Sequence, residues 1–337
     1  MHMIRLICGR YPLKKDLDNS CVATLGNFDG MHLGHQSLLK SLGSLGQEFG
    51  LPTTVIVFEP QPKEFFSKNH QVCSRLMRFR EKYAVLQSWK IDFLLCLRFD
   101  QVLANLPPEN FVKEILVDRL KVRAIVVGDD YRFGAKRVGN YQLLQKMGER
   151  YSFKTVEMTS VLHKNQRISS TRIRRALEMG NLDLAQSLLG RPYWICGKVI
   201  SGEKRGRSLG FPTANIDLHR NKVPLTGIFV IRAYLENEAF QGVASLGMRP
   251  TFGGTRILLE TYLFNLSCNI YGHYLRVEFL HRLRPEECFS STDALVKQIR
   301  QDVSEAKYFF NINFDFDRTN KSLCCIDSRD SLKENVG

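Results

Sequence analysis

Residues 26–35 read Gly-Asn-Phe-Asp-Gly-Met-His-Leu-Gly-His and set the architecture of the N-terminal half. They follow the apolar run 21–25, which is typical of a buried strand. They lead into leucines at positions 33, 38, 39, 42 and 45, whose spacing predicts a helix. The stretch therefore joins a strand to a helix, and in an open α/β sheet this corner is where ligands bind.

The residue types in this stretch suit phosphate. A helix start offers free backbone N–H groups and the positive end of the helix dipole. The glycines let the backbone come close to a ligand, and His32 and His35 can donate hydrogen bonds to phosphate oxygens. Two histidines alone would fit a polar surface cluster, but the whole string favours a nucleotide triphosphate site. Zinc is less favoured, because no third or fourth ligand lies at a standard spacing.

Composition describes an ordinary cytoplasmic protein. The chain has 337 residues, enough for two domains, with 44% hydrophobic and 24% charged residues. No apolar run is long enough to span a bilayer, and residues 1–5 lead into Tyr11-Pro12 without an apolar signal core. The nine cysteines include no Cys-x-x-Cys pair, which favours reduced thiols.

The net charge of +14 is unevenly distributed. Residues 1–190 carry 28 basic and 18 acidic side chains, and residues 191–337 carry 20 and 16. The basic excess therefore accompanies the histidine motif. It suits either nucleic acid or a small polyanion such as ATP, and the lack of basic runs interleaved with aromatic residues favours the small anion.

The pattern of elements changes near residue 190. Before it, the predicted strands 53–58, 93–97 and 124–127 alternate with predicted helices, which indicates a parallel sheet covered on both faces. The helices are expected at 78–89, 108–120 and 141–150. After it, short strand-like runs separated by turns predict an antiparallel barrel or sandwich. These runs are 193–200, 227–235, 242–246, 258–263 and 275–279, followed by a helix near 291–309 and a polar, frayed tail beyond residue 318.

Two further motifs lie in the first half. Residues 127–134 follow a predicted strand, so Asp130 and Arg132 would face the same crevice as the histidines, although Gly-Asp-Asp also suits a simple turn. Residues 167–175 place hydroxyls and arginines around a predicted helix start, with Ser169 or Ser170 as the N-cap. Together these motifs suggest nucleotidyl transfer, in which a phosphate oxygen attacks the α-phosphorus of Mg²⁺-bound ATP and pyrophosphate leaves.

The second half has its own glycine-rich, basic motif at residues 197–215. It is not a Walker A loop, but its N–H groups could wrap phosphates. In a strand, Thr213 and Asn215 would point the same way and could hold Mg²⁺. A basic hairpin with an exposed turn fits the motif equally well. Glu260, in the strand-like run 258–263, could be a general base for an alcohol or a solvent-facing residue.

Together these motifs resemble the bifunctional bacterial riboflavin biosynthesis family, in which riboflavin kinase is fused to FMN adenylyltransferase (FAD synthetase). The resemblance covers residues 22–307 and includes the matching stretches 188–193 and 247–252. It implies a doubly wound, Rossmann-like nucleotidyltransferase domain at 1–190, a riboflavin kinase barrel at 191–318 and a tail at 319–337. It also implies ATP and Mg²⁺ as requirements, riboflavin, FMN and FAD as substrates or products, and a monomer or weak homo-oligomer without nucleic-acid or membrane partners.

The resemblance also assigns roles to individual residues. In the adenylyltransferase, His32, His35 and Arg174 would be catalytic, and the remaining motif residues would bind nucleotide and flavin. These are Gly26, Phe28, Asp29, Gly30, Gly34, Asp130, Ser170 and Thr171. In the kinase, Glu260 would deprotonate the ribityl hydroxyl, Thr213 and Asn215 would hold Mg²⁺, and the loop would bind ATP through Gly202, Arg205, Gly206, Gly210 and Pro212.

Three positions depart from the family pattern. Gln61 stands where His is usual, Ser245 where Asn is usual and Lys307 where Arg is common. We expect Gln61 to weaken the adenylyltransferase and Lys307 to alter flavin affinity. One alternative is a single-activity member with one half reduced to a binding or regulatory module. The other is an RNA-binding or tRNA-charging protein, although no recognisable RNA module is present.

Overall fold

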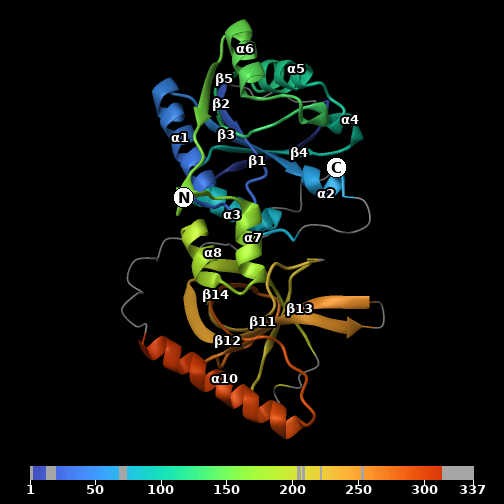
Figure 1. Cartoon of the computed structure of the whole chain (residues 1–337), viewed down its shortest axis with the longest axis vertical. Coiled ribbons are helices and arrows are strands. Elements are labelled where there is room, and N and C mark those ends of the chain that lie inside the picture. Colours follow the sequence, from blue (N-terminus) through green and yellow to red (C-terminus); the bar gives the residue numbers. More distant parts are fainter. Residues whose placement is uncertain are drawn as a thin grey trace. The chain divides into compact units, whose positions relative to one another are not determined.

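The computed structural model describes residues 3–12, 20–67, 74–202, 206, 209–220, 222–251 and 254–312. These residues form two compact units (Figure 1). The sheet unit contains the described residues up to 67 together with Lys82–Ser169. The barrel unit contains Ser74–Glu81 and the described residues from Ser170 onward. A short segment from the first half of the sequence therefore belongs to the unit formed mainly by the second half.

The sheet unit is built on six parallel strands in the order β1-β4-β3-β2-β5-β6. Their bounds are Arg5–Arg10 (β1), Phe93–Arg98 (β4), Thr53–Glu59 (β3), Cys21–Leu25 (β2), Val122–Gly128 (β5) and Lys154–Met158 (β6). Every residue of β2 is buried, as its unbroken apolar run predicts. The two edge strands, β1 and β6, were not predicted, because their half-exposed residues form no such run.

Helices cover both faces of this sheet, as a doubly wound fold requires. On one face, Ala23 of β2 packs in a cluster with Ile115 and Leu144. On the other face, α1 (Leu33–Phe49) packs on β2: a side chain at Gly46 would begin 3.7 Å from Val22 Cγ2, an ordinary van der Waals contact. Further helical segments are α2 (Pro62–Phe65), α4 (Gln101–Ala104), α5 (Pro108–Asn110), the 3-10 turn η2 (Ala135–Arg137) and α6 (Tyr141–Tyr151), with a hairpin of β7 (Leu162–His163) and β8 (Gln166–Arg167).

The helix predicted at 108–120 is present but differs in its winding. It begins as α5 and continues through Phe111–Arg119 as a π-helix. Both α- and π-winding place the apolar side chains of this segment against the sheet, so the apolar pattern alone does not distinguish them. The helix predicted at 78–89 is α3 (Phe79–Ser88).

The barrel unit contains a closed antiparallel barrel in the order β10-β13-β12-β11-β14-β9, which confirms the predicted fold class. The bounds are Tyr193–Ile200 (β9), Ala214–Asp217 (β10), Gly227–Leu235 (β11), Glu238–Thr251 (β12), Gly254–Leu263 (β13) and Tyr274–Arg284 (β14). Helices α7 (Ser170–Glu178) and α8 (Leu182–Leu189) belong to the same unit. The terminal helix α10 (Thr292–Ile312) packs through Ala306 and Phe310 against Val230 and Val243.

The sheet unit and the barrel unit do not test two of the expectations from the sequence. The boundary near residue 190 was drawn between two activities, and it stays a prediction. The frayed tail beyond residue 318 lies outside the described residues. Within the described part of the chain, we find no helix with the length and apolar character needed to cross a bilayer.

Phe229 offers a test of the barrel core. Its side chain is fully buried, and its ring meets Phe279 edge to face with centroids 5.2 Å apart. Phe229→Ala should lower the free energy of unfolding of the barrel unit by about 3–5 kcal/mol, because a cavity replaces the ring. In a Trp89→Phe background, Trp194 is the remaining tryptophan and lies in β9, so urea unfolding followed by its fluorescence reports on the barrel.

Tyr271→Ala is the matched control. Tyr271 lies in the same unit and is 48% exposed. Its replacement should change the free energy of unfolding by less than about 0.5 kcal/mol. Equal urea midpoints for the two variants would contradict the assigned core.

Candidate active sites

The turn after β2 is held by buried side chains on an unusual backbone. The Gly26 N–H donates to Ile56 O at 3.1 Å, which extends the pairing of β2 with β3. Phe28, Gly30 and Met31 then adopt left-handed backbone angles (φ 47°, 86° and 46°). Phe28 and Met31 are fully buried and Asp29 nearly so, and this burial compensates for the strain of the turn. The turn therefore delivers the chain sharply into α1.

His32 is the N-cap of α1. Its backbone is extended, and its Nδ1 accepts a hydrogen bond from the His35 N–H at 3.4 Å. A side chain at Gly34 would begin 3.2 Å from the His32 ring, so the ring lies close against this backbone. Gln36 Nε2 donates to Met31 O at 2.9 Å and ties the first helical turn back to the loop.

The two predicted histidines form one stacked pair. Their ring centroids are 3.7 Å apart with an interplanar angle of 19°, and the Phe28 ring lies 5.1 Å from His35. His35 Nδ1 is inaccessible and has no hydrogen-bond partner among the described residues. Burial, followed by the positive charges of His32, Lys82 and Arg167, lowers the pKa of His35 well below 6.5. His35 is therefore a neutral imidazole at neutral pH.

The loop after β5 lies at the same edge of the sheet as this turn. β2 and β5 are parallel neighbours, and the chain continues from β2 to β3 on one side and from β5 to β6 on the other. Their carboxyl ends therefore flank the topological switch point, where ligands of open α/β sheets bind. Asp130 in this loop pairs with Arg167 Nη2 at 2.5 Å, and both side chains are partly exposed.

The neighbouring Asp129 has a structural partner. Its two carboxylate oxygens accept hydrogen bonds from the Ser160 N–H at 2.9 Å and from Ser160 Oγ at 2.8 Å. Burial opposes ionisation of this carboxyl, but the two hydrogen bonds outweigh it, so the pKa of Asp129 is lowered. Asp129 therefore fixes the loop, and Asp130 is the carboxylate that reaches solvent.

The second predicted phosphate motif lies in the barrel unit. α7 begins at Ser170 and contains Thr171 and Arg174. Arg174 is buried, and its Nε donates to Ser74 O at 2.6 Å. The structure thus brings His32 and His35 together within the sheet unit, and it assigns Ser170, Thr171 and Arg174 to the other unit. Their contribution to the histidine site stays a prediction.

In the barrel unit, three predicted or noted polar residues form one row across adjacent strands. Asn215 of β10 is directly opposite Glu260 of β13, and Glu260 is directly opposite Ser245 of β12. Residues directly opposite in an antiparallel pair have Cβ atoms about 5 Å apart on the same face. Because side chains alternate along β13, Glu260 shares its face with Tyr262, which packs on the apolar cluster that holds α10.

The glycine-rich loop lies directly against this row. A side chain at Gly202 would begin 2.1 Å from Asn215 Nδ2, and one at Gly206 would begin 3.1 Å from Thr213 Oγ1. At Gly206 only glycine fits, because a side chain would also begin 2.4 Å from the backbone oxygen of Phe211, whereas Asn215 Nδ2 ends a flexible side chain that could turn away from Gly202. Farther along the motif, Gly210 has φ 85° and Pro212 leads into Thr213. Arg205 lies outside the described residues.

The donor set at this row limits which cation it could bind. Across the described residues, no group of three or more His, Cys, Asp and Glu side chains could hold a metal ion. Thr213 offers a hydroxyl and Asn215 an amide oxygen, close to a loop whose backbone can approach phosphates. Such a site suits Mg²⁺, which keeps several waters and shares substrate phosphates.

α10 is fastened beside the same row by an ion pair. Arg284 of β14 donates from Nε and Nη2 to the Asp302 carboxylate at 2.9 and 2.8 Å. Asp302 is buried, so the pair anchors the helix to the barrel. Lys307, one of the three departures, lies on α10 with its Nζ 5.6 Å from the Phe264 ring centroid. The expected flavin end of this site therefore has a cation above an aromatic ring.

Sequence reasoning missed two charged residues of the sheet unit. Lys82 is fully buried in α3, and Arg167 pairs with Asp130, and the charges of both act on His35. Arg167 could have been found because it begins the motif 167–175. Nothing in the local sequence indicated that Lys82 is buried, since a lysine in an amphipathic helix normally faces solvent.

Gln61, one of the three departures from the family pattern, is buried as the N-cap of α2, and its N–H donates to Glu64 Oε2 at 3.0 Å.

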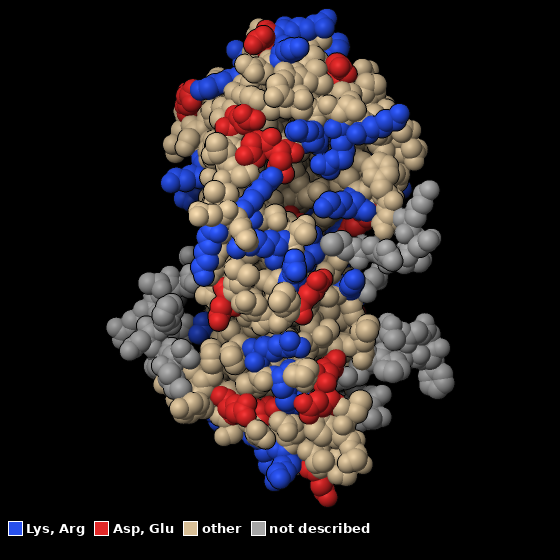
Figure 2. Space-filling view, in the orientation of Figure 1, with Lys and Arg blue, Asp and Glu red and all other residues tan. Residues whose placement is uncertain are grey.

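Charged side chains of both signs share the face of the molecule that Figure 2 draws. In Figure 2, Lys and Arg side chains are numerous on the face drawn but are interrupted by Asp and Glu.

Comparison with known proteins identifies both halves of the chain. A family model described as FAD synthetase matches residues 14–172, and one described as riboflavin kinase matches residues 189–310. The bifunctional riboflavin kinase/FMN adenylyltransferase of Haemophilus influenzae is 44% identical over 309 residues, which are 91% of this chain and 100% of the relative. The protein of the same name from Escherichia coli K12 is 41% identical over 310 residues, which are 92% and 99% of the two chains.

A solved structure matches the same extent of the chain. The crystal structure of a macrolide-efflux protein from Streptococcus pneumoniae aligns with a TM-score of 0.78 and 30% identity, over 88% of this chain and 97% of that chain. The relatives and the two family models agree with the resemblance found in the motifs. The chain belongs to the family of bifunctional riboflavin kinase/FMN adenylyltransferases.

Proposed function

We propose that this chain makes both flavin cofactors. Its C-terminal part phosphorylates riboflavin to FMN with ATP, and its N-terminal part transfers the AMP group of a second ATP to FMN, which yields FAD and pyrophosphate. The two family models support this order of activities along the chain. We assign residues 1–190 to the adenylyltransferase and 191–318 to the kinase, and we propose a cytoplasmic monomer or weak homo-oligomer that acts on small molecules.

One observation carries the proposal of two separate reactions. The stacked pair His32–His35 lies in the sheet unit, and the row Asn215–Glu260 lies in the barrel unit. The first group offers imidazole hydrogen-bond donors, and the second offers a carboxylate beside a glycine-rich loop. The histidine pair has no carboxylate that could act as a base for a hydroxyl, and the Asn215–Glu260 row has no pair of imidazole donors for the phosphates. One site would therefore not serve both reactions.

In the adenylyltransferase, the histidines would hold the ATP phosphates. Because His32 Nδ1 accepts the His35 N–H, a neutral His32 carries its proton on Nε2. His35 Nδ1 is buried without a partner, so the proton is better placed on Nε2 there as well. Both rings then offer an N–H donor to phosphate oxygens next to the positive end of α1. A phosphate oxygen of FMN forms the new bond to the α-phosphorus, and the bond to pyrophosphate breaks.

In the kinase, Glu260 would accept the proton of the ribityl hydroxyl as the hydroxyl oxygen attacks the γ-phosphorus of ATP, and the bond from that phosphorus to the leaving ADP breaks. Asn215, directly opposite, and Thr213 would hold a Mg²⁺ ion together with the ATP phosphates. The bound cation would neutralise the charge of the transferring phosphoryl group. The loop at Gly202 and Gly206 would cover the phosphates and exclude water from the transfer.

The alternative of one active half has a simple discriminator. Incubation with riboflavin, ATP and Mg²⁺, followed by chromatography, separates FMN from FAD. Accumulation of FMN without FAD would indicate that the sheet unit is a binding module. Absence of FMN, with FAD made from supplied FMN, would indicate the converse.

His32→Ala tests the adenylyltransferase assignment. It should reduce FAD formation from supplied FMN about a hundredfold or more, because a donor to the transition-state charge is lost, and it should leave FMN formation from riboflavin intact. His32→Asn is the matched control, since asparagine preserves the N-cap of α1. Recovery of FAD formation in His32→Asn would contradict phosphate binding and reduce His32 to a helix cap.

Glu260→Gln tests the kinase assignment. It preserves the size of the side chain and removes the base, so FMN formation should fall by about 10²–10⁴-fold while FAD formation from supplied FMN continues. Glu236→Gln is the control, because Glu236 is an exposed carboxylate in a turn of the same unit. The proposed base is wrong if Glu260→Gln and Glu236→Gln phosphorylate riboflavin equally fast.

The neutral His35 predicts a pH dependence of stability. An unfolded His35 takes up a proton near pH 6.5, whereas the folded residue, with its lowered pKa, stays neutral. Stability is therefore present above about pH 6.5 and is lost as the pH falls, by at most about 1.4 kcal/mol per pH unit. The free energy of unfolding of the native chain, measured in urea, should fall relative to His35→Gln between about pH 7.5 and about pH 5.5. A difference that does not change with pH would mean that His35 titrates normally.

A further inference from the structure

The segment Ser74–Glu81 is an unexpected part of the barrel unit. It comes from the first half of the sequence, within the part matched by the FAD synthetase model, yet it packs with the barrel. Leu76 and Met77 are buried, and Tyr193 OH of β9 donates to Leu76 O at 3.0 Å. The barrel unit is therefore completed by residues that lie more than a hundred positions earlier in the chain.

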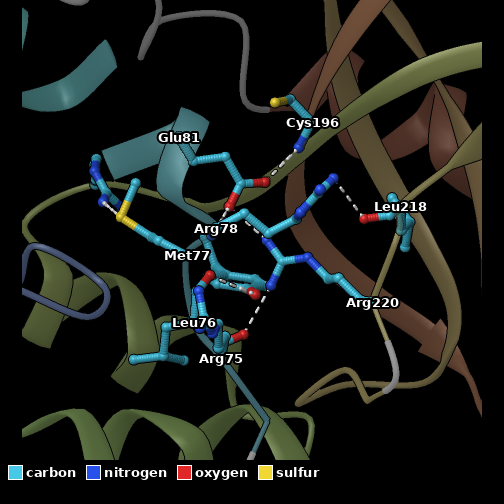
Figure 3. Close-up of polar contacts among 10 residues, drawn as sticks. Arg75, Leu76, Met77, Arg78, Glu81, Cys196, Leu218 and Arg220 are labelled. Atoms are coloured by element: carbon cyan, nitrogen blue, oxygen red, sulfur yellow. Dashed lines mark hydrogen bonds and ion pairs between the residues drawn. The ribbon is translucent and has the colours of Figure 1, made fainter. Parts of the chain in front are cut away.

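Glu81 is the centre of this contact. It is fully buried, and its Oε1 accepts the Cys196 N–H of β9 at 2.9 Å. Its Oε2 accepts Arg220 Nη2 at 2.5 Å and the Arg78 N–H at 2.6 Å (Figure 3). Burial alone would lower the pKa of Arg220, but the Glu81 carboxylate outweighs it and raises that pKa. The two residues thus form a charged pair inside the protein.

The same segment holds the chain immediately after β10 at two further points. Arg220 Nη1 donates to Arg75 O at 2.8 Å, and Arg78 Nη1 donates to Leu218 O at 3.0 Å (Figure 3). Leu218 follows β10 directly, three residues after Asn215. β10 has only four residues, so it has few ladder hydrogen bonds of its own with which to keep its register.

Glu81 also contacts β9, the strand that pairs with β10 on the side opposite to β13. Cys196 belongs to β9, which pairs with β10 through Ile216–Val199 and Asp217–Lys198. The Glu81 carboxylate is therefore hydrogen-bonded both to β9, at Cys196, and to Arg220, which lies just after β10. This arrangement restrains the short strand that presents Asn215 to Glu260. A shift of that strand by one residue would turn Asn215 to the opposite face.

We propose that Glu81 and Arg220 are a positioning pair for the kinase site: they hold β10 in the register that sets Asn215 opposite Glu260. The role rests on the proposed function of that row. A buried ion pair contributes little net stability, because desolvation of both charges offsets their attraction. Conformational specificity is the better physical reason for such a pair, and the element that it restrains is β10.

The test uses the full chain and steady-state kinase kinetics. Glu81→Gln should lower kcat/KM for Mg²⁺–ATP on the order of tenfold to a hundredfold, because groups that hold a substrate are misplaced. The loss should appear as a raised KM for Mg²⁺–ATP, with the KM for riboflavin unchanged. Glu236→Gln, the exposed control in the same unit, should behave as the native chain does. Continued FAD formation from supplied FMN would show that the sheet unit is folded, and the unchanged KM for riboflavin would show that the barrel unit is folded.

A double variant separates positioning from stability. Glu81→Gln leaves the Arg220 charge buried and unpaired, which destabilises the unit; Glu81→Gln combined with Arg220→Leu removes that charge. The double variant should regain a melting temperature close to that of the native chain and keep the raised KM for Mg²⁺–ATP. A native KM in the double variant would overturn the inference, and so would a melting temperature no higher than that of the single variant. Loss of the proposed function would be recognised separately, as normal FMN formation by Glu260→Gln.

Discussion

Backbone pairing in the closed barrel is the interaction on which the candidate kinase site depends. Asn215, Glu260 and Ser245 come from three different strands and meet because the ladder sets them opposite one another. Side chains alternate along a strand, so a slip of one position would carry Glu260 to the face occupied by Leu259 and Thr261. Closure of the barrel leaves no free edge along which such a slip is easy. The segment that contains Glu81 adds a restraint where the ladder is shortest.

The histidine pair and the buried ion pair use burial in opposite ways. At the histidine pair, burial and neighbouring positive charges keep His35 neutral, so it can donate to phosphate without carrying charge itself. At the pair Glu81–Arg220, both groups are charged and each compensates for the desolvation of the other. The first arrangement is suited to an incoming anion. In the second, the two charges compensate each other without a ligand, which is why a structural role fits it.

Much of the fold could be predicted from local sequence. Strand β2 and residues 124–127 of β5 are buried on both faces, so their apolar runs are unbroken, whereas β1 and β6 at the edges have no such signal. The site residues could be nominated singly, because their types suit phosphate chemistry. Their partners could not, since the ion pair of Asp130 with Arg167 and the burial of Lys82 depend on segments that are distant in sequence.

The sequence by itself determined the order of the two folds, the glycine–histidine turn and the family. These features reside in residue types and short-range spacing, which survive without a fold. The tertiary structure decided that Asn215 is opposite Glu260, that His35 is neutral and that Glu81 belongs to the barrel unit. Strand register, desolvation and buried pairing arise only when distant segments are packed together, so no local pattern records them.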